Sequence, residues 1–139
     1  MAITAFLYNQ SKLRPFNGNG DDWDEASALK VALFTDTYTP ALADTLYSSL
    51  SGEVATGNGY TTGGEVLAGT SFAGTTTVVF DASDTTWTFS ASKTMRYAVI
   101  YDVSSSRLIA YVDFGTNQSS SSTFTITWNA SGIFNITST

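Results

Sequence analysis

From residue 75 onward, large apolar residues recur at every second position of short segments. The clearest case is Thr123–Trp128, in which every second residue from Phe124 to Trp128 is large and apolar and the others are threonine. This alternation predicts β-strands with one buried face, because successive side chains point to opposite faces of a sheet. The segments that show it are Thr75–Phe80, Thr85–Phe89, Arg96–Tyr101, Leu108–Phe114, Thr123–Trp128 and Ile133–Ile136.

Turn-forming residues separate these segments, as in Asp81–Asp84, Ser104–Ser106 and Asn129–Gly132. Short strands at this spacing are typical of an antiparallel sandwich or barrel. Composition agrees, because only 13% of the residues are charged, about half the usual share, and threonine and aromatic residues favour strands. We therefore predict a mainly all-β protein built as one antiparallel β-sandwich, similar in type to a jelly roll.

The half of the chain before residue 75 carries a weaker pattern. Leu29–Thr35 predicts a strand buried over most of its surface, and Ala43–Leu50 predicts a short helix that ends near Gly52. The glycine-dense stretch Gly57–Gly64 predicts a turn in which glycines supply positive φ angles. Two short strands, at 53–56 and 65–68, are expected on either side of it.

The N-terminal segment has apolar residues at helical spacing, over residues 2–16. Two alternatives remain open at this point: a short amphipathic helix packed on its own domain, or an arm that grips a neighbouring subunit. Pro15 and the acidic segment Asn17–Glu25 then end any helix. The expected organisation is an N-terminal arm or helix with an acidic loop over residues 1–28, followed by a β-sandwich over residues 29–139.

The chain contains no histidine and no cysteine, which excludes several kinds of chemistry. Serine–histidine and cysteine–histidine catalysis, zinc sites built on thiolate or imidazole, haem on a histidine, and disulfides all require one of these residues. A formal net charge of −6 argues against nucleic acid as a partner, since that affinity comes largely from Lys and Arg. No apolar stretch approaches the roughly 20 residues of a membrane span. We expect no cofactor, no nucleic acid and no membrane.

Carboxylates are the enzymatic groups that remain. The pairs considered are Asp81 with Asp84, Asp102 with Asp113, and Glu53 with Glu65. A glycosidase needs two carboxyls about 5–9 Å apart across a cleft, whereas aspartates of a turn bond their own backbone. The second interpretation is favoured for Asp81–Asp84, and no catalytic residue is assigned. The acidic segment 17–25 lacks the spacing of a calcium loop, so a solvated loop is favoured over a metal site.

Two groups of apolar residues are candidates for an interface with another subunit. The first is the set that a gripping arm would present. The second comprises two loop aromatics, which either cap the core or anchor a partner, because aromatic residues are enriched at interaction hot spots. The candidate interface residues are Phe6, Leu7, Leu13, Phe16, Trp23 and Tyr60.

An ordered series of sequence blocks covers most of the chain after residue 28. The blocks are Lys30–Pro40, Glu53–Gly69, Val79–Trp87, Arg96–Tyr101, Leu108–Gly115 and Phe124–Ile133. Their series resembles small structural proteins of tailed-bacteriophage virions, whereas residues 1–28 match only loosely. The resemblance implies a virion component without a catalytic motif, and it leaves capsid, neck, tail and fibre positions open.

The resemblance and the acidic charge together lead us to expect a non-enzymatic decoration or cement protein on the outer capsid surface, stabilising the junctions between capsomers. A compact, acidic β domain suits permanent packing against other subunits outside the DNA-filled head. Its partners would be the major capsid protein or other virion subunits, with assembly in the host bacterial cytoplasm. A homotrimer is expected because quasi-threefold capsid sites favour that symmetry. The alternative is a neck, tail or head-fibre component that binds a receptor or a glycan.

Overall fold

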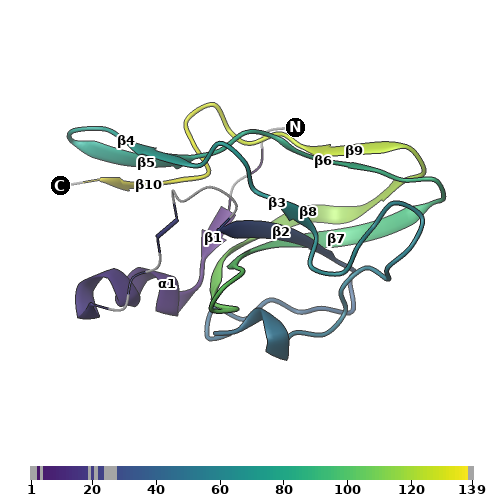
Figure 1. Ribbon diagram of the computed structural model, residues 1–139, viewed down its shortest axis with the longest axis horizontal. Coiled ribbons are helices and arrows are strands. Elements are labelled where there is room, and N and C mark those ends of the chain that lie inside the picture. Colours follow the sequence, from purple (N-terminus) through teal and green to yellow (C-terminus); the bar gives the residue numbers. More distant parts are fainter. Residues whose placement is uncertain (1–2, 4, 19, 21, 24–27, 138–139) are drawn as a thin grey trace.

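Two layers of antiparallel strands make up most of the structure (Figure 1). The computed structural model describes residues 3, 5–18, 20, 22–23 and 28–137. Its strands are β1 (Ala5–Leu7), β2 (Leu29–Phe34), β3 (Glu65–Val66), β4 (Ser71–Ala73), β5 (Thr77–Asp81), β6 (Thr85–Thr88), β7 (Lys93–Asp102), β8 (Leu108–Ser120), β9 (Thr123–Ile126) and β10 (Phe134–Thr137). One layer is a sheet of order β1-β8-β7-β2-β3, and the other contains the sheets β10-β5-β4 and β6-β9. The predicted all-β, sandwich-like fold is confirmed.

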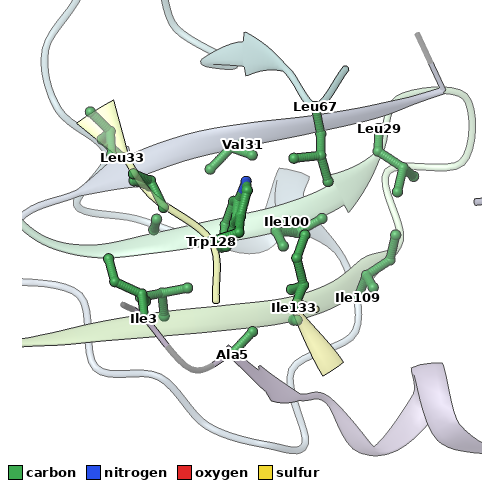
Figure 2. Packing of buried hydrophobic residues seen from close by; sticks show 14 of the residues in the cluster. Ile3, Ala5, Leu29, Val31, Leu33, Leu67, Ile100, Ile109, Trp128 and Ile133 are labelled. Carbon is green, nitrogen blue, oxygen red and sulfur yellow. The ribbon is translucent and has the colours of Figure 1, made fainter. Parts of the chain in front are cut away.

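The main core lies between the two layers. Along β2, Leu29, Val31 and Leu33 are fully buried in this core, as the period-2 pattern of a strand requires. Figure 2 shows Trp128 in the middle of the cluster, with Val31 on one side and Ile3 on the other. The alternation predicted for Thr123–Trp128 therefore reports the core face correctly, although β9 itself ends at Ile126.

The other face of the five-stranded sheet is covered as well, by a second cluster rich in tyrosine. Ala32 and Phe34 of β2 belong to it, together with Tyr8 and Tyr38. Figure 1 shows the chain between β2 and β3 beneath the sheet, on the side away from β6 and β9. This double coverage explains why β2 reads as a nearly continuous apolar run rather than an alternating one.

The helix predicted over residues 2–16 is wrong in its first half. Residues 5–7 form β1, which pairs with β8 in the register Ala5↔Val112 and Leu7↔Ala110. The open edge of β8 offers backbone hydrogen bonds that three residues of isolated helix cannot match. The helical part begins later, as α1 (Asn9–Leu13) and the 3₁₀ turn η1 (Arg14–Asn17).

The boundary predicted at residue 28 does not separate the N-terminal segment from the sandwich. β1 and β2 are strands of the same five-stranded sheet, on either side of β7 and β8. Tyr8, which follows β1, is fully buried, and its backbone N–H donates to the carbonyl of Ile109 at 3.1 Å. The segment is therefore part of the same packed unit.

The helix predicted at Ala43–Leu50 is replaced by an irregular segment with one 3₁₀ turn, η2 (Tyr47–Ser49). Part of its backbone bonds to the β7–β8 turn and the start of β8: Tyr47 N–H donates to Ser106 at 2.7 Å, and Leu108 N–H donates to Thr45 at 3.0 Å. The strand predicted at 53–56 is reduced to one bridge between Phe34 and Glu53.

The glycine-rich stretch Gly57–Gly64 forms the predicted turn with positive φ angles. Gly64 has a φ of +73°, and a Cβ at this position would collide with the backbone carbonyl of Val31 in β2. Glycine therefore allows the loop to approach the sheet closely, which places Tyr60 in the core.

Candidate functional site

An apolar groove lies between the N-terminal helical segment and the edge of the three-stranded sheet. It contains cavities of about 310 and 230 Å³ that share Pro15, Trp23 and Ile136 as lining residues. Figure 1 shows α1 and β10 at the same end of the molecule. We call this feature the N-terminal groove. Its two sides are lined mainly by Leu7, Lys12, Pro15 and Phe16, and by Phe72, Phe134 and Ile136.

Buried polar contacts hold one side of the helical segment against the sheet. The Ser11 hydroxyl lies 2.8 Å from the carbonyl of Ile109, and both it and the Arg14 side chain are buried. The Arg14 guanidinium reaches the carbonyls of Leu108 at 3.5 Å and Thr45 at 3.4 Å. These contacts fix the orientation of α1 and η1, so the residues on their opposite side face solvent.

Phe16 and Leu13 are the apolar side chains that this orientation exposes. Phe16 is 89% exposed and lines the groove, and Leu13 is 55% exposed. Phe16 is the most exposed large apolar residue among those that the structure describes. Leu7, by contrast, is partly buried and packs against the core while contributing to the groove wall.

Phe6 lies on a different surface from this group. Adjacent residues of a strand point to opposite faces, so Phe6 points away from the groove that Leu7 lines. Its ring stacks on Tyr111 at 5.3 Å, beside the tyrosine-rich cluster, and it remains 48% exposed. The apolar residues proposed for one arm surface are therefore divided between two faces.

Trp23, the other loop aromatic, is buried beside the groove. It is 8% exposed and packs against Phe72, Phe80 and Phe134 with ring-centroid distances of 5.8 to 6.2 Å. Of the two alternatives for this residue, the core cap is the one that the structure shows. Trp23 forms the floor of the groove, whereas Phe16 is the aromatic residue of the groove that is most exposed to solvent.

Tyr60 is also a core residue, so the core cap is again the alternative that the structure shows. The side chain is 2% exposed, and its hydroxyl lies 2.9 Å from the backbone N–H of Leu33, which donates to it. The same hydroxyl donates to Glu53 Oε1 at 2.7 Å. The close approach of the glycine-rich turn to β2 explains this burial. The sequence does not indicate it, because Tyr60 lies in a loop.

Glu53 connects several residues of the loop between β2 and β3 by hydrogen bonds. Its carboxylate accepts hydrogen bonds from the hydroxyls of Tyr47 and Tyr60 and from the backbone N–H of Gly63. Tyr47 in turn stacks on Tyr101 of β7, with centroids 4.0 Å apart and planes nearly parallel. Burial, and then the neighbouring carboxylate, raise the pKa of both Tyr47 and Tyr60 well above the usual value. These phenols therefore act as fixed donors at neutral pH.

Three of the other carboxylates considered as catalytic pairs, Asp84, Asp113 and Asp102, have structural partners of their own. Asp84 accepts from the backbone N–H of Trp128 at 3.1 Å, so it links β6 to the segment after β9. Asp113 forms an ion pair with Arg96 at 2.9 Å, and the hydrogen bond from Arg96 lowers the pKa of Asp113.

Asp102 is buried at the end of β7. Burial acts to raise its pKa, but hydrogen bonds from Ser104 and Ser105 outweigh that effect, and the pKa of Asp102 is lowered. This carboxylate therefore fixes the β7–β8 turn, in the way that aspartates commonly bond a following backbone.

In the described part of the chain, no group of three or more acidic residues is placed so that it could hold a metal ion. The acidic segment 17–25 extends outside the described residues at positions 19, 21, 24 and 25. The preference for a solvated loop over a calcium site at this segment therefore stays a prediction.

Within the described residues, no helix is both long and apolar enough to cross a bilayer. Comparison of the chain with models of protein families, with curated proteins and with solved structures gives no match.

Proposed function

We propose that the chain is a non-enzymatic structural component of a phage virion. In this role it decorates the outer capsid surface and stabilises the junctions between capsomers. One observation carries the proposal: Phe16 is 89% exposed beside an apolar groove, although Ser11 and Arg14 bond its segment to the sheet. The sequence blocks that resemble phage virion proteins supply the setting.

The physical argument rests on the cost of exposing an ordered aromatic side chain. Burying a side chain of this kind contributes roughly 1.5–3 kcal/mol. A neighbouring subunit that covers Phe16 would gain this contribution, and it would lose little conformational entropy because α1 and η1 are already fixed. Many such contacts repeated over a shell reinforce one another through effective concentration.

Charge supports a position outside the head. The chain carries 12 acidic and 6 basic residues, so contact with packaged DNA would be repulsive. The partners proposed are the major capsid protein or other virion subunits, and the proposed location is the virion. A glycan-binding role on a neck, tail or fibre would need an exposed aromatic platform, and Trp23 and Tyr60 do not provide one because both are buried.

Cryo-electron microscopy of the virus particle that encodes the chain tests the proposal. We expect density for this fold repeated over the shell at capsomer junctions, with the surface around Phe16 covered by a neighbouring subunit. A particle assembled with a Phe16→Ser chain should lose most of that density. A matched Val66→Ser chain should retain it, because Val66 is exposed on β3, at the opposite edge of the sheet from β1.

Two outcomes would contradict the proposal. Absence of the chain from purified particles would remove the virion role altogether. Density confined to the neck, the tail or a fibre would retain a structural role but overturn the decoration of the capsid.

A further inference from the structure

The N-terminal groove and a side chain able to fill such a groove belong to the same surface. Phe16 contributes to one wall, yet it is 89% exposed, so most of its ring points away from its own groove. Ile136 on the opposite wall is 59% exposed. A surface that carries both a protruding ring and an apolar recess is complementary to itself.

Such a surface favours a two-fold arrangement. In a two-fold dimer both subunits use the same patch, and each contact occurs twice. In a ring of three, the protruding side chain and the recess would lie on two separate surfaces of each subunit. Here Phe16 lines the recess itself, so reciprocal insertion around a two-fold axis fits the geometry better than the expected trimer.

The sheet side of the groove can extend the contact. β10 lies at the edge of its three-stranded sheet and has β5 as its one strand neighbour in the described structure. Phe16 alone would contribute apolar area on the order of 150 Å² or more when covered. Together with Leu13 and Ile136 it can supply the apolar centre of an interface of standard size, about 800 Å² on each partner.

We propose that the occupant of the N-terminal groove is a second copy of this chain, in a two-fold dimer in which Phe16 of each copy enters the groove of the other. This inference rests on the assembly role proposed above and specifies its first step, the formation of a dimer that then attaches to the shell. It is tested on the purified chain without the particle, so it can fail while the virion role stands.

Sedimentation equilibrium of the full chain, from about 1 µM to about 1 mM, measures the association directly. We expect the mass to rise with concentration from 14.8 kDa to twice that value and then to level off. The Phe16→Ser chain should show a dissociation constant raised about 30-fold or more, as for a hot-spot residue. The Val66→Ser chain should associate like the unaltered chain.

Three results would overturn the proposal. These are a mass of one chain at every concentration, a limiting mass of three chains, and a dimer that the Phe16→Ser substitution does not weaken. If the single chain binds capsid protein through Phe16 but never forms a dimer, the groove belongs to the capsid contact, and the assembly role survives without the dimer.

Discussion

Two irregular segments cover the five-stranded sheet, and they differ in what their aromatic residues do. The loop between β2 and β3 places Tyr47 and Tyr60 on Glu53, so each hydroxyl has a fixed acceptor inside the molecule. The N-terminal segment is also bonded to the sheet, through Ser11 and Arg14, but it leaves Phe16 exposed on its other side. The first segment is complete within the chain, whereas the second presents an apolar surface that another molecule can cover.

Aromatic residues in these irregular segments differ in whether they indicate an interface. Tyr60 and Trp23 drew attention because they are large and lie in loops, yet both complete the core. Phe16 has no polar atom to tether it and no cavity of its own to fill, and it lies on a segment whose backbone is fixed. An exposed aromatic on a fixed segment is a better indicator of an interface than an aromatic in a loop.

The largest expected effect on stability is in the loop between β2 and β3. Tyr60→Ala should lower the free energy of unfolding by about 4 kcal/mol, because it empties a buried aromatic site and leaves Leu33 N–H without its acceptor. Chemical denaturation measures this change. Tyr60→Phe, which keeps the ring, should cost about 1.5 kcal/mol. A loss below 1 kcal/mol for the alanine variant would mean that this loop is not part of the stable core.

Removal of the shared acceptor should have the next largest effect. Glu53→Ala should cost about 2 kcal/mol, because it leaves the donors of Tyr47, Tyr60 and Gly63 without the carboxylate. The matched control is Glu65→Ala, which removes an exposed carboxylate from the other side of the same turn and should change stability by less than about 0.5 kcal/mol. Equal effects of the two substitutions would contradict the structural role of Glu53.

The third largest expected effect is a loss of stability at alkaline pH, caused by the tyrosine-rich cluster. Burial, and then hydrogen bonding to Tyr38, raise the pKa of Tyr8 above its unfolded value near 10, and burial also raises the pKa of Tyr38 to about 12. The stability that these groups contribute is fully present below pH 10 and is lost as the pH rises above it. Tyr8 alone should contribute a slope of up to about 1.4 kcal/mol per pH unit.

Unfolding titrations at pH 8, 10 and 11 measure this slope. Tyr8→Phe should reduce it, because phenylalanine fills the same space and does not ionise. A slope that is unchanged in this variant would show that Tyr8 does not stay protonated in the folded chain at these pH values.

The smallest expected effect on stability is at the exposed segment. Phe16→Ser should change the free energy of unfolding by less than about 0.5 kcal/mol, because the side chain is almost fully exposed in the single chain. Thermal unfolding of dilute protein measures it. A loss above 1.5 kcal/mol would place Phe16 in the core of the chain and remove the contrast between the two segments.

The sequence predicts the sandwich because its strands carry a strong local signal. Val31, Phe124 and Trp128 lie at period-2 positions, and that spacing is independent of the rest of the chain. The errors fall where backbone pairing over a long range decides the conformation. β1 is a strand because the edge of β8 is available, and 43–50 is not a helix because its backbone bonds to the β7–β8 turn. No local pattern encodes either partner.

The positions of the candidate interface residues could be predicted only in part, for the same reason. Phe16 could be proposed from the sequence because it belongs to the apolar residues at helical spacing over residues 2–16. The burial of Trp23 depends on β4, β5 and β10 meeting beneath it, which the sequence does not reveal. The groove itself forms between segments more than 100 residues apart, so it becomes visible only in the folded chain.

Hydroxyl-radical footprinting of the chain, in dilute solution and in the assembled particle, tests the central claim most directly. The claim is that the surface around Phe16 is covered on assembly, whereas the aromatic residues of the loop between β2 and β3 are already buried in the single chain. We predict that oxidation of Phe16 and Ile136 falls several-fold in the particle, whereas Tyr60 is protected in both states and Val66 in neither. Equal oxidation of Phe16 in the two states would contradict the account.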